Sequence, residues 1–173
     1  MTDSLKPKDD SRLIVTLSEL EMSIAAGIGC TRQIESRSKR RVDSSGKGVE
    51  ALWEYDINGA IGEYVVAKSL NVFPDLRLGT FKLPDIGKLQ VRTTLYDNGC
   101  LLVRTYDSSD DLFALVVCVR NQLFTYRIAG CLRGYEAMQP QWLTDKGNGR
   151  EPQYFVPQSA LNPFLTWAEF QAL

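Results

Sequence analysis

Four side chains combine types and spacing that suit chemistry on one face of the protein. In "LPDIGKLQVRTT", residues 83–94, polar residues alternate with apolar ones, which predicts a strand. Alternation places Gln90 and Arg92 on the same face of that strand. Asp85 lies just upstream in a proline-containing turn that can aim its carboxylate at this face. Glu63 comes earlier, on a predicted helix face whose other residues are mostly small and apolar. An acid in such a place is seldom an ordinary solvent-exposed residue.

The absence of histidine from the sequence narrows the possible chemistry. It excludes mechanisms that need an imidazole base and metal sites that need an imidazole ligand. Any metal would have to be held by oxygen ligands, which suits hard cations such as Mg²⁺, Mn²⁺ or Ca²⁺. The four cysteines are scattered singly, without the close pairs of a zinc site or the density of a disulfide scaffold.

The length and composition predict one globular domain. With 173 residues, 44% of them hydrophobic, the chain can bury one sizeable core, which we place in residues 16–173. Residues 1–15 are polar and are expected to be disordered or loosely held. No apolar run has the length of a membrane span and no signal peptide is evident, so we expect a soluble, cytoplasmic protein without a membrane partner. The "SSGKG" segment lacks the spacing of a phosphate-binding loop, so no nucleotide cofactor is expected.

Two helices are predicted before the strands. The first begins near Thr16, with Thr16 or Ser18 as its N-cap, and the second covers residues 49–70. A basic segment follows the first helix. It is interpreted either as an arm that contacts nucleic-acid phosphates or, equally, as a solvated helix end and loop. Its candidate contact residues are Arg32, Arg37, Lys39, Arg40 and Arg41. The formal net charge of -1 argues against a uniformly basic binder and still allows such a local groove.

Four strands are predicted downstream, at residues 88–94, 100–106, 112–120 and 123–129. The "LYDNG" segment predicts a hairpin between the first two, and "NQ" a second hairpin between the last two. The run "LFALVVCV" is apolar on both faces, as expected of a central strand. A short helix in "LRGYEAM" and an irregular C-terminal cover complete the chain. The prediction is an α+β domain, similar to an α/β sandwich, with a mixed but mostly antiparallel sheet of four to five strands.

The order of these motifs resembles the PD-(D/E)XK nuclease superfamily, whose core is restriction-endonuclease-like. That superfamily has a helical Glu, a Pro-Asp at a strand start, and an acid-x-Lys on the adjacent strand. The matching positions are Glu63 in "GAIGEYVVAKSL", Asp85 in "LPDIG", and Gln90 and Arg92 in "LQVRTT". Together with "LLVRTYD" and "FVPQSALNP", these motifs are similar to a set of phage and bacterial proteins usually placed in that superfamily.

The resemblance implies a DNA endonuclease that hydrolyses phosphodiesters with Mg²⁺ or Mn²⁺. In that family Asp85, the residue at position 90 and the backbone carbonyl of Val91 would bind the metal. Glu63 would bind it through water or orient the attacking water. DNA is the partner implied, and a homodimer is a possible one, because a small domain often needs a second subunit to cut both strands.

Two departures from the family pattern leave two interpretations open. Gln90 replaces an acid of the family pattern. Arg92 replaces a lysine, and because a guanidinium is permanently protonated, it cannot act as a general base. In a catalytic version, Gln90 is a neutral ligand and Arg92 clamps the phosphate. In a degenerate version, Arg92 pairs with Glu63 or Asp85, and the fold binds nucleic acid or regulates without cutting. Asp56, two turns before Glu63, is the first-ranked substitute for the missing acid, and the acids of "YDSSDD" are expected in a solvated turn.

Overall fold

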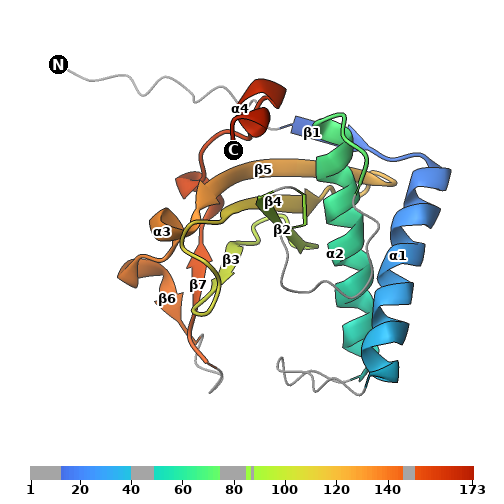
Figure 1. The fold of residues 1–173 in the computed structure, drawn as a ribbon, viewed down its shortest axis with the longest axis horizontal. Helices are drawn as coiled ribbons and strands as arrows, with labels where there is room; N and C mark the ends of the chain where they lie inside the picture. Colours follow the sequence, from blue (N-terminus) through green and yellow to red (C-terminus); the bar gives the residue numbers. More distant parts are fainter. Residues whose placement is uncertain (1–12, 40–48, 75–84, 87, 146–150) are drawn as a thin grey trace.

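The computed structural model describes residues 13–39, 49–74, 85–86, 88–145 and 151–173. It is a layered α+β structure in which a four-stranded sheet lies between two helices on one side and a smaller sheet on the other (Figure 1). The α+β prediction is confirmed at this level.

The larger sheet is mixed, with the strand order β1-β5-β4-β2. Its strands are β1 (Leu13–Thr16), β2 (Leu89–Thr94), β4 (Leu112–Cys118) and β5 (Thr125–Arg133). β2 runs parallel to β4, and the other two pairings are antiparallel. Six of the seven β4 residues are buried, which confirms the prediction of a central strand covered on both faces.

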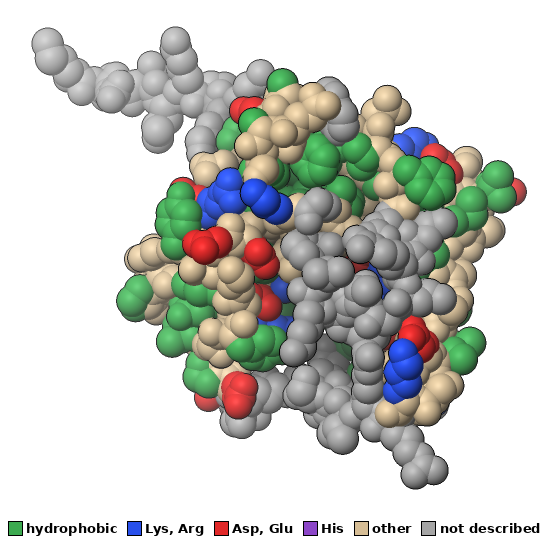
Figure 2. Space-filling view, in the orientation of Figure 1, with side chains coloured by type: hydrophobic (Ala, Val, Ile, Leu, Met, Phe, Trp, Pro, Cys, Tyr) green, Lys and Arg blue, Asp and Glu red, His purple; other side chains and the backbone are tan. Residues whose placement is uncertain are grey.

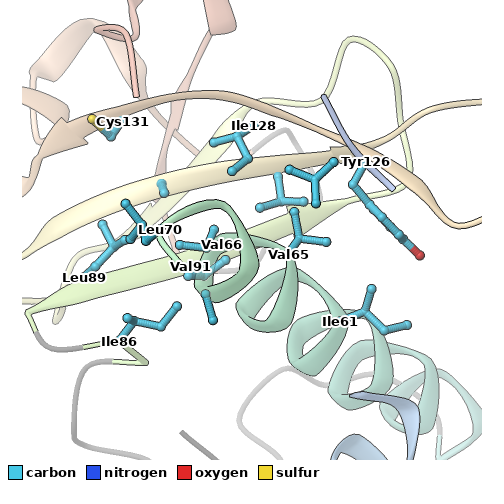
Figure 3. Close-up of a cluster of buried hydrophobic side chains, with 14 of the residues drawn as sticks. Ile61, Val65, Val66, Leu70, Ile86, Leu89, Val91, Tyr126, Ile128 and Cys131 are labelled. Atoms are coloured by element: carbon cyan, nitrogen blue, oxygen red, sulfur yellow. The ribbon is translucent and has the colours of Figure 1, made fainter. Parts of the chain in front are cut away.

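Helix α2 (Val49–Ser69) covers one face of this sheet, and helix α1 (Glu19–Ser38) packs against α2 (Figure 1). α1 begins at Ser18, whose side chain accepts from the Glu21 amide while the Glu21 carboxylate accepts from the Ser18 amide. α2 packs on the sheet through Val65 and Val66, both fully buried in the main hydrophobic cluster (Figure 3). The burial of this apolar face is what fixes α2 against β2 and β4.

The second sheet is antiparallel, with the order β3-β7-β6. It comprises β3 (Leu101–Arg104), β6 (Leu143–Thr144) and β7 (Gln153–Val156). Its buried residues meet the far face of β4 and β5 in a second hydrophobic cluster, which includes Leu101, Val103, Phe113 and Val156. The short helix predicted near residue 134 is present as α3 (Gly134–Ala137), and α4 (Trp167–Gln171) ends the chain.

Three predictions about the elements were wrong. Residues 13–15 are not loosely held, because the β-branched run at the N-terminus pairs with β5 and buries Val15. The segment beyond residue 137 is not merely irregular, since β6, β7 and α4 form within it. The four predicted strands also do not form one sheet, because β3 lies in the smaller one.

The predicted hairpin between β2 and β3 is therefore absent. A turn does form there, with the Gly99 amide donating to the Tyr96 carbonyl, but it carries the chain out of the first sheet. The apolar β4 takes the place beside β2, where both its faces are covered, and β3 instead pairs with β7. The β4–β5 hairpin is confirmed by their antiparallel pairing.

In the portion of the chain that the structure describes, no helix is long and apolar enough to cross a membrane.

Candidate site at the edge of strand β2

Asp85 is held against the backbone of β2 by a tight chain reversal. Ile86 and Leu89 exchange two backbone hydrogen bonds, and both side chains are buried in the main core. This reversal folds Asp85 back along the strand, where its Oδ2 accepts from the Val91 amide at 2.6 Å. Among the described strands β2 pairs only with β4, so this contact satisfies an amide that has no strand partner.

The surroundings of Asp85 disfavour its negative charge. Burial and the neighbouring Glu63 carboxylate raise the pKa of Asp85 to about 7, against the opposing effects of the Val91 amide, Arg92 and Arg32. The effect of Glu63 places the two carboxylates within electrostatic range of each other. A carboxyl group whose pKa is raised by burial and by a neighbouring charge is typical of a functional site.

Gly62 brings Glu63 to this edge. A Cβ at position 62 would lie 1.9 Å from the Thr93 Oγ1 of β2, so only glycine allows α2 to approach the strand this closely. The next residue of α2, Glu63, lies within electrostatic range of Asp85.

Arg32 of α1 donates two parallel hydrogen bonds to the Glu63 carboxylate. Its Nη1 donates to Glu63 Oε1 at 2.6 Å and its Nη2 to Oε2 at 2.7 Å. Only 19% of the Arg32 side chain and 12% of the Glu63 side chain are exposed. Burial alone would lower the pKa of Arg32, but Glu63, Asp85 and Asp56 together raise it, so three carboxylates act on one guanidinium.

Gln90 and Arg92 are held by a different segment, the loop after β3. The Gln90 amide donates to Asp111 at 3.2 Å, and Arg92 Nη2 donates to Asp107 at 2.9 Å. The Arg92 guanidinium also lies 5.2 Å from the centre of the Phe113 ring, and its Nη1 donates to the Val91 carbonyl at 3.4 Å. These two β2 side chains therefore have internal partners on the face that meets the second sheet.

Asp85 interacts electrostatically with Glu63, with Arg92 and with Arg32, which the sequence suggested only as a groove residue. The predicted shared face is wrong, however. Gln90 and Arg92 point toward the second sheet, whereas Glu63 comes from α2, which packs on the opposite face of β2. Sequence reasoning missed Asp107, whose side chain is 13% exposed and is not part of a solvated turn. The signal was its place directly after an Arg-containing strand in "LLVRTYD".

The remaining basic candidates lie near the C-terminal half of α1. The Arg37 guanidinium lies 5.2 Å from the Trp53 ring centre, and Lys39 forms an ion pair with Glu35. Arg40 and Arg41 lie outside the described residues. Asp56, the proposed substitute acid, lies next to the buried Gln33 amide of α1, which can donate to it and accept from Arg37.

The oxygen atoms at the β2 edge are the candidate ligands for the metal that the resemblance implies. The described residues contain no group of three or more acidic, Cys or His side chains suited to a metal ion. They do offer the carboxylates of Asp85 and Glu63, which interact electrostatically, and the carbonyl of Val91, whose amide donates to Asp85. All are hard oxygen donors, and burial and Glu63 both disfavour the charged form of Asp85. This small set fits a cation such as Mg²⁺, which usually keeps several waters.

Comparisons of the chain with protein-family models, curated proteins and solved structures found no match. Its function is therefore argued from the geometry of the site and from the motif resemblance.

Proposed function

We propose that this domain is a divalent-cation-dependent DNA endonuclease of the PD-(D/E)XK type, with a variant site at the edge of β2. The observation that carries the proposal is the placement of the buried Asp85 carboxyl against β2, within electrostatic range of Glu63; burial first and Glu63 second raise the pKa of Asp85 to about 7. The order of Glu63, Asp85, Gln90 and Arg92 in the sequence supports it.

In this proposal Asp85, Glu63 and the Val91 carbonyl would hold the cation. When bound, Mg²⁺ or Mn²⁺ supplies positive charge to the scissile phosphate and lowers the pKa of a bound water. The hydrogen bond from the Val91 amide orients the Asp85 carboxylate. Arg92 would contact the phosphate, for which a guanidinium is well shaped, by exchanging its bond to Asp107 for one to the phosphate.

DNA cleavage tests this function directly. Supercoiled, linear and single-stranded DNA would be incubated with Mg²⁺ or Mn²⁺ and the native protein, Asp85→Asn or Glu63→Gln. Asparagine keeps an oxygen that can accept from the Val91 amide, so Asp85→Asn removes charge with little change of shape. We expect metal-dependent nicking by the native protein and a loss of about a hundredfold or more in both variants.

The matched control is Arg120→Gln, which changes an exposed side chain outside the site and passes through the same purification. It should cleave as the native protein does. Absence of cleavage by the native protein, or equal cleavage by Asp85→Asn, would overturn the proposed activity.

A second candidate is a nuclease-like domain that binds nucleic acid or regulates without cutting. The observation in its favour is the Arg32–Glu63 contact, because an internal guanidinium already neutralises one of the two acids. DNA binding that is equal in EDTA and in Mg²⁺, without cleavage in either, would favour this candidate.

A further inference from the structure

We propose that Arg32 is an internal counter-ion that competes with the divalent cation for Glu63, and so sets the cation affinity of the site. The inference rests on the proposed function, because it concerns how that same site is loaded. It assigns Arg32 to regulation of the site rather than to the nucleic-acid groove.

The geometry shows that Arg32 takes all of the carboxylate that a cation would use. Both Glu63 oxygens accept from the guanidinium, at 2.6 and 2.7 Å. A cation cannot take either oxygen at full strength while both of these charge-assisted bonds are in place. Binding therefore requires Arg32 to give up at least one of them.

The charges around Arg32 show why its withdrawal would favour a cation. The guanidinium interacts with Asp85 and Asp56 as well as with Glu63. Without it, Glu63 and Asp85 would be two neighbouring carboxylates with less positive charge nearby. A divalent cation would then be the strongest available compensation.

The packing of α1 allows this exchange without loss of the fold. A Cβ at Gly29 would lie 2.5 Å from the Ile57 Cα, so the two helix backbones touch one turn before Arg32. The backbone of α1 is thereby fixed, whereas 19% of the Arg32 side chain still reaches solvent. The side chain can move by rotation about its own bonds while the helix stays in place.

Manganese binding tests the inference without reference to catalysis. Free Mn²⁺ would be measured by electron paramagnetic resonance during titration of the native protein, Arg32→Gln and Arg120→Gln. Arg120→Gln removes the same charge from an exposed turn. We expect Arg32→Gln to bind Mn²⁺ about tenfold more tightly than the native protein, and Arg120→Gln to bind as the native protein does.

The outcomes separate the inference from the proposed function. Saturable binding that is unchanged or weaker in Arg32→Gln would overturn the counter-ion role and leave the cation site standing. Tightening of equal size in Arg120→Gln would also overturn it, because the effect would then be one of net charge. Absence of saturable binding in the native protein and in Arg32→Gln would overturn the proposed function, and the inference with it.

A second measurement uses the native protein alone, in case Arg32→Gln does not fold. The arginine Nε–Hε resonances would be recorded during Mg²⁺ titration, with the Arg32 signal assigned by triple-resonance spectra of the native protein. We expect the Arg32 signal to shift with the same saturation curve as Mg²⁺ binding. An Arg32 signal that stays constant while Mg²⁺ saturates the site would overturn the inference.

Discussion

At the scale of single residues, the account depends on how the protein treats the charge of Asp85. The side chain is anchored by one backbone amide and faces a second carboxylate, so its ionised form is costly when the cation is absent. The sequence predicted that Asp85 and Glu63 share a site, because an acid on an apolar helix face and a Pro-Asp turn are both unusual, and the two groups interact electrostatically in the structure. It did not indicate Arg32 as the partner of Glu63, since nothing in a single sequence shows which arginine on one helix faces an acid on the next.

The pH dependence of stability follows from that cost. The folded pKa of Asp85, about 7, exceeds its ordinary value of 3.8, so the folded state holds the proton more tightly than the unfolded state does. The corresponding stability is fully present below about pH 4 and is lost as the pH rises toward 7. Between pH 5 and pH 8, in EDTA, we expect the native protein to lose about 2–3 kcal/mol more than Asp85→Asn does. Urea unfolding of both proteins at each pH measures this difference, and parallel profiles would contradict it.

At the scale of elements, local signals in the sequence predicted most of what forms. The Ser18 cap, the long α2, the alternation in β2 and the apolar β4 are all present. Pairing was predicted less well, because a strand and a turn do not specify which neighbour the strand will take. The β2–β3 hairpin failed because β4, buried on both faces, gains more by lying next to β2.

Alanine substitutions at two glycines of α1 distinguish the effect of close helix contact on stability from the effect of helix propensity. Gly29→Ala would place its Cβ 2.5 Å from backbone of α2, which must move away, whereas Gly27→Ala meets nothing within 4 Å. We expect Gly29→Ala to reduce the free energy of unfolding by about 1–3 kcal/mol, and Gly27→Ala to leave it equal or raise it by up to about 1 kcal/mol. Thermal or urea unfolding distinguishes the two. Equal stability of the variants would show that the helices do not pack this closely.

At the scale of the whole molecule, one face shows how the charges of the described residues are distributed. On the face shown in Figure 2, Lys and Arg side chains lie near Asp and Glu side chains and do not form one continuous basic surface. This agrees with the formal net charge of -1. Any DNA contact therefore depends on a few local residues, of which Arg37 and Lys39 on α1 are the candidates that the structure describes.

Salt-dependent binding tests that assignment. We expect the double variant Arg37→Gln/Lys39→Gln to bind duplex DNA about three- to tenfold more weakly at low salt, with a shallower dependence on salt concentration. Arg104→Gln/Arg120→Gln removes the same charge from other exposed positions and serves as the control. Fluorescence anisotropy at several salt concentrations measures both. An equal loss in the two double variants would indicate that only net charge matters.

The central claim is that Asp85 and Glu63 form a cation site, and a crystal grown with Mn²⁺ tests it most directly. Anomalous difference density would be collected near the manganese absorption edge and compared with a crystal of Asp85→Asn grown in the same way. We expect a peak in contact with Asp85 and Glu63, with Arg32 turned away from at least one Glu63 oxygen, and no peak in Asp85→Asn. A map without a peak at this edge, with Arg32 still bonded to both Glu63 oxygens, would contradict the claim.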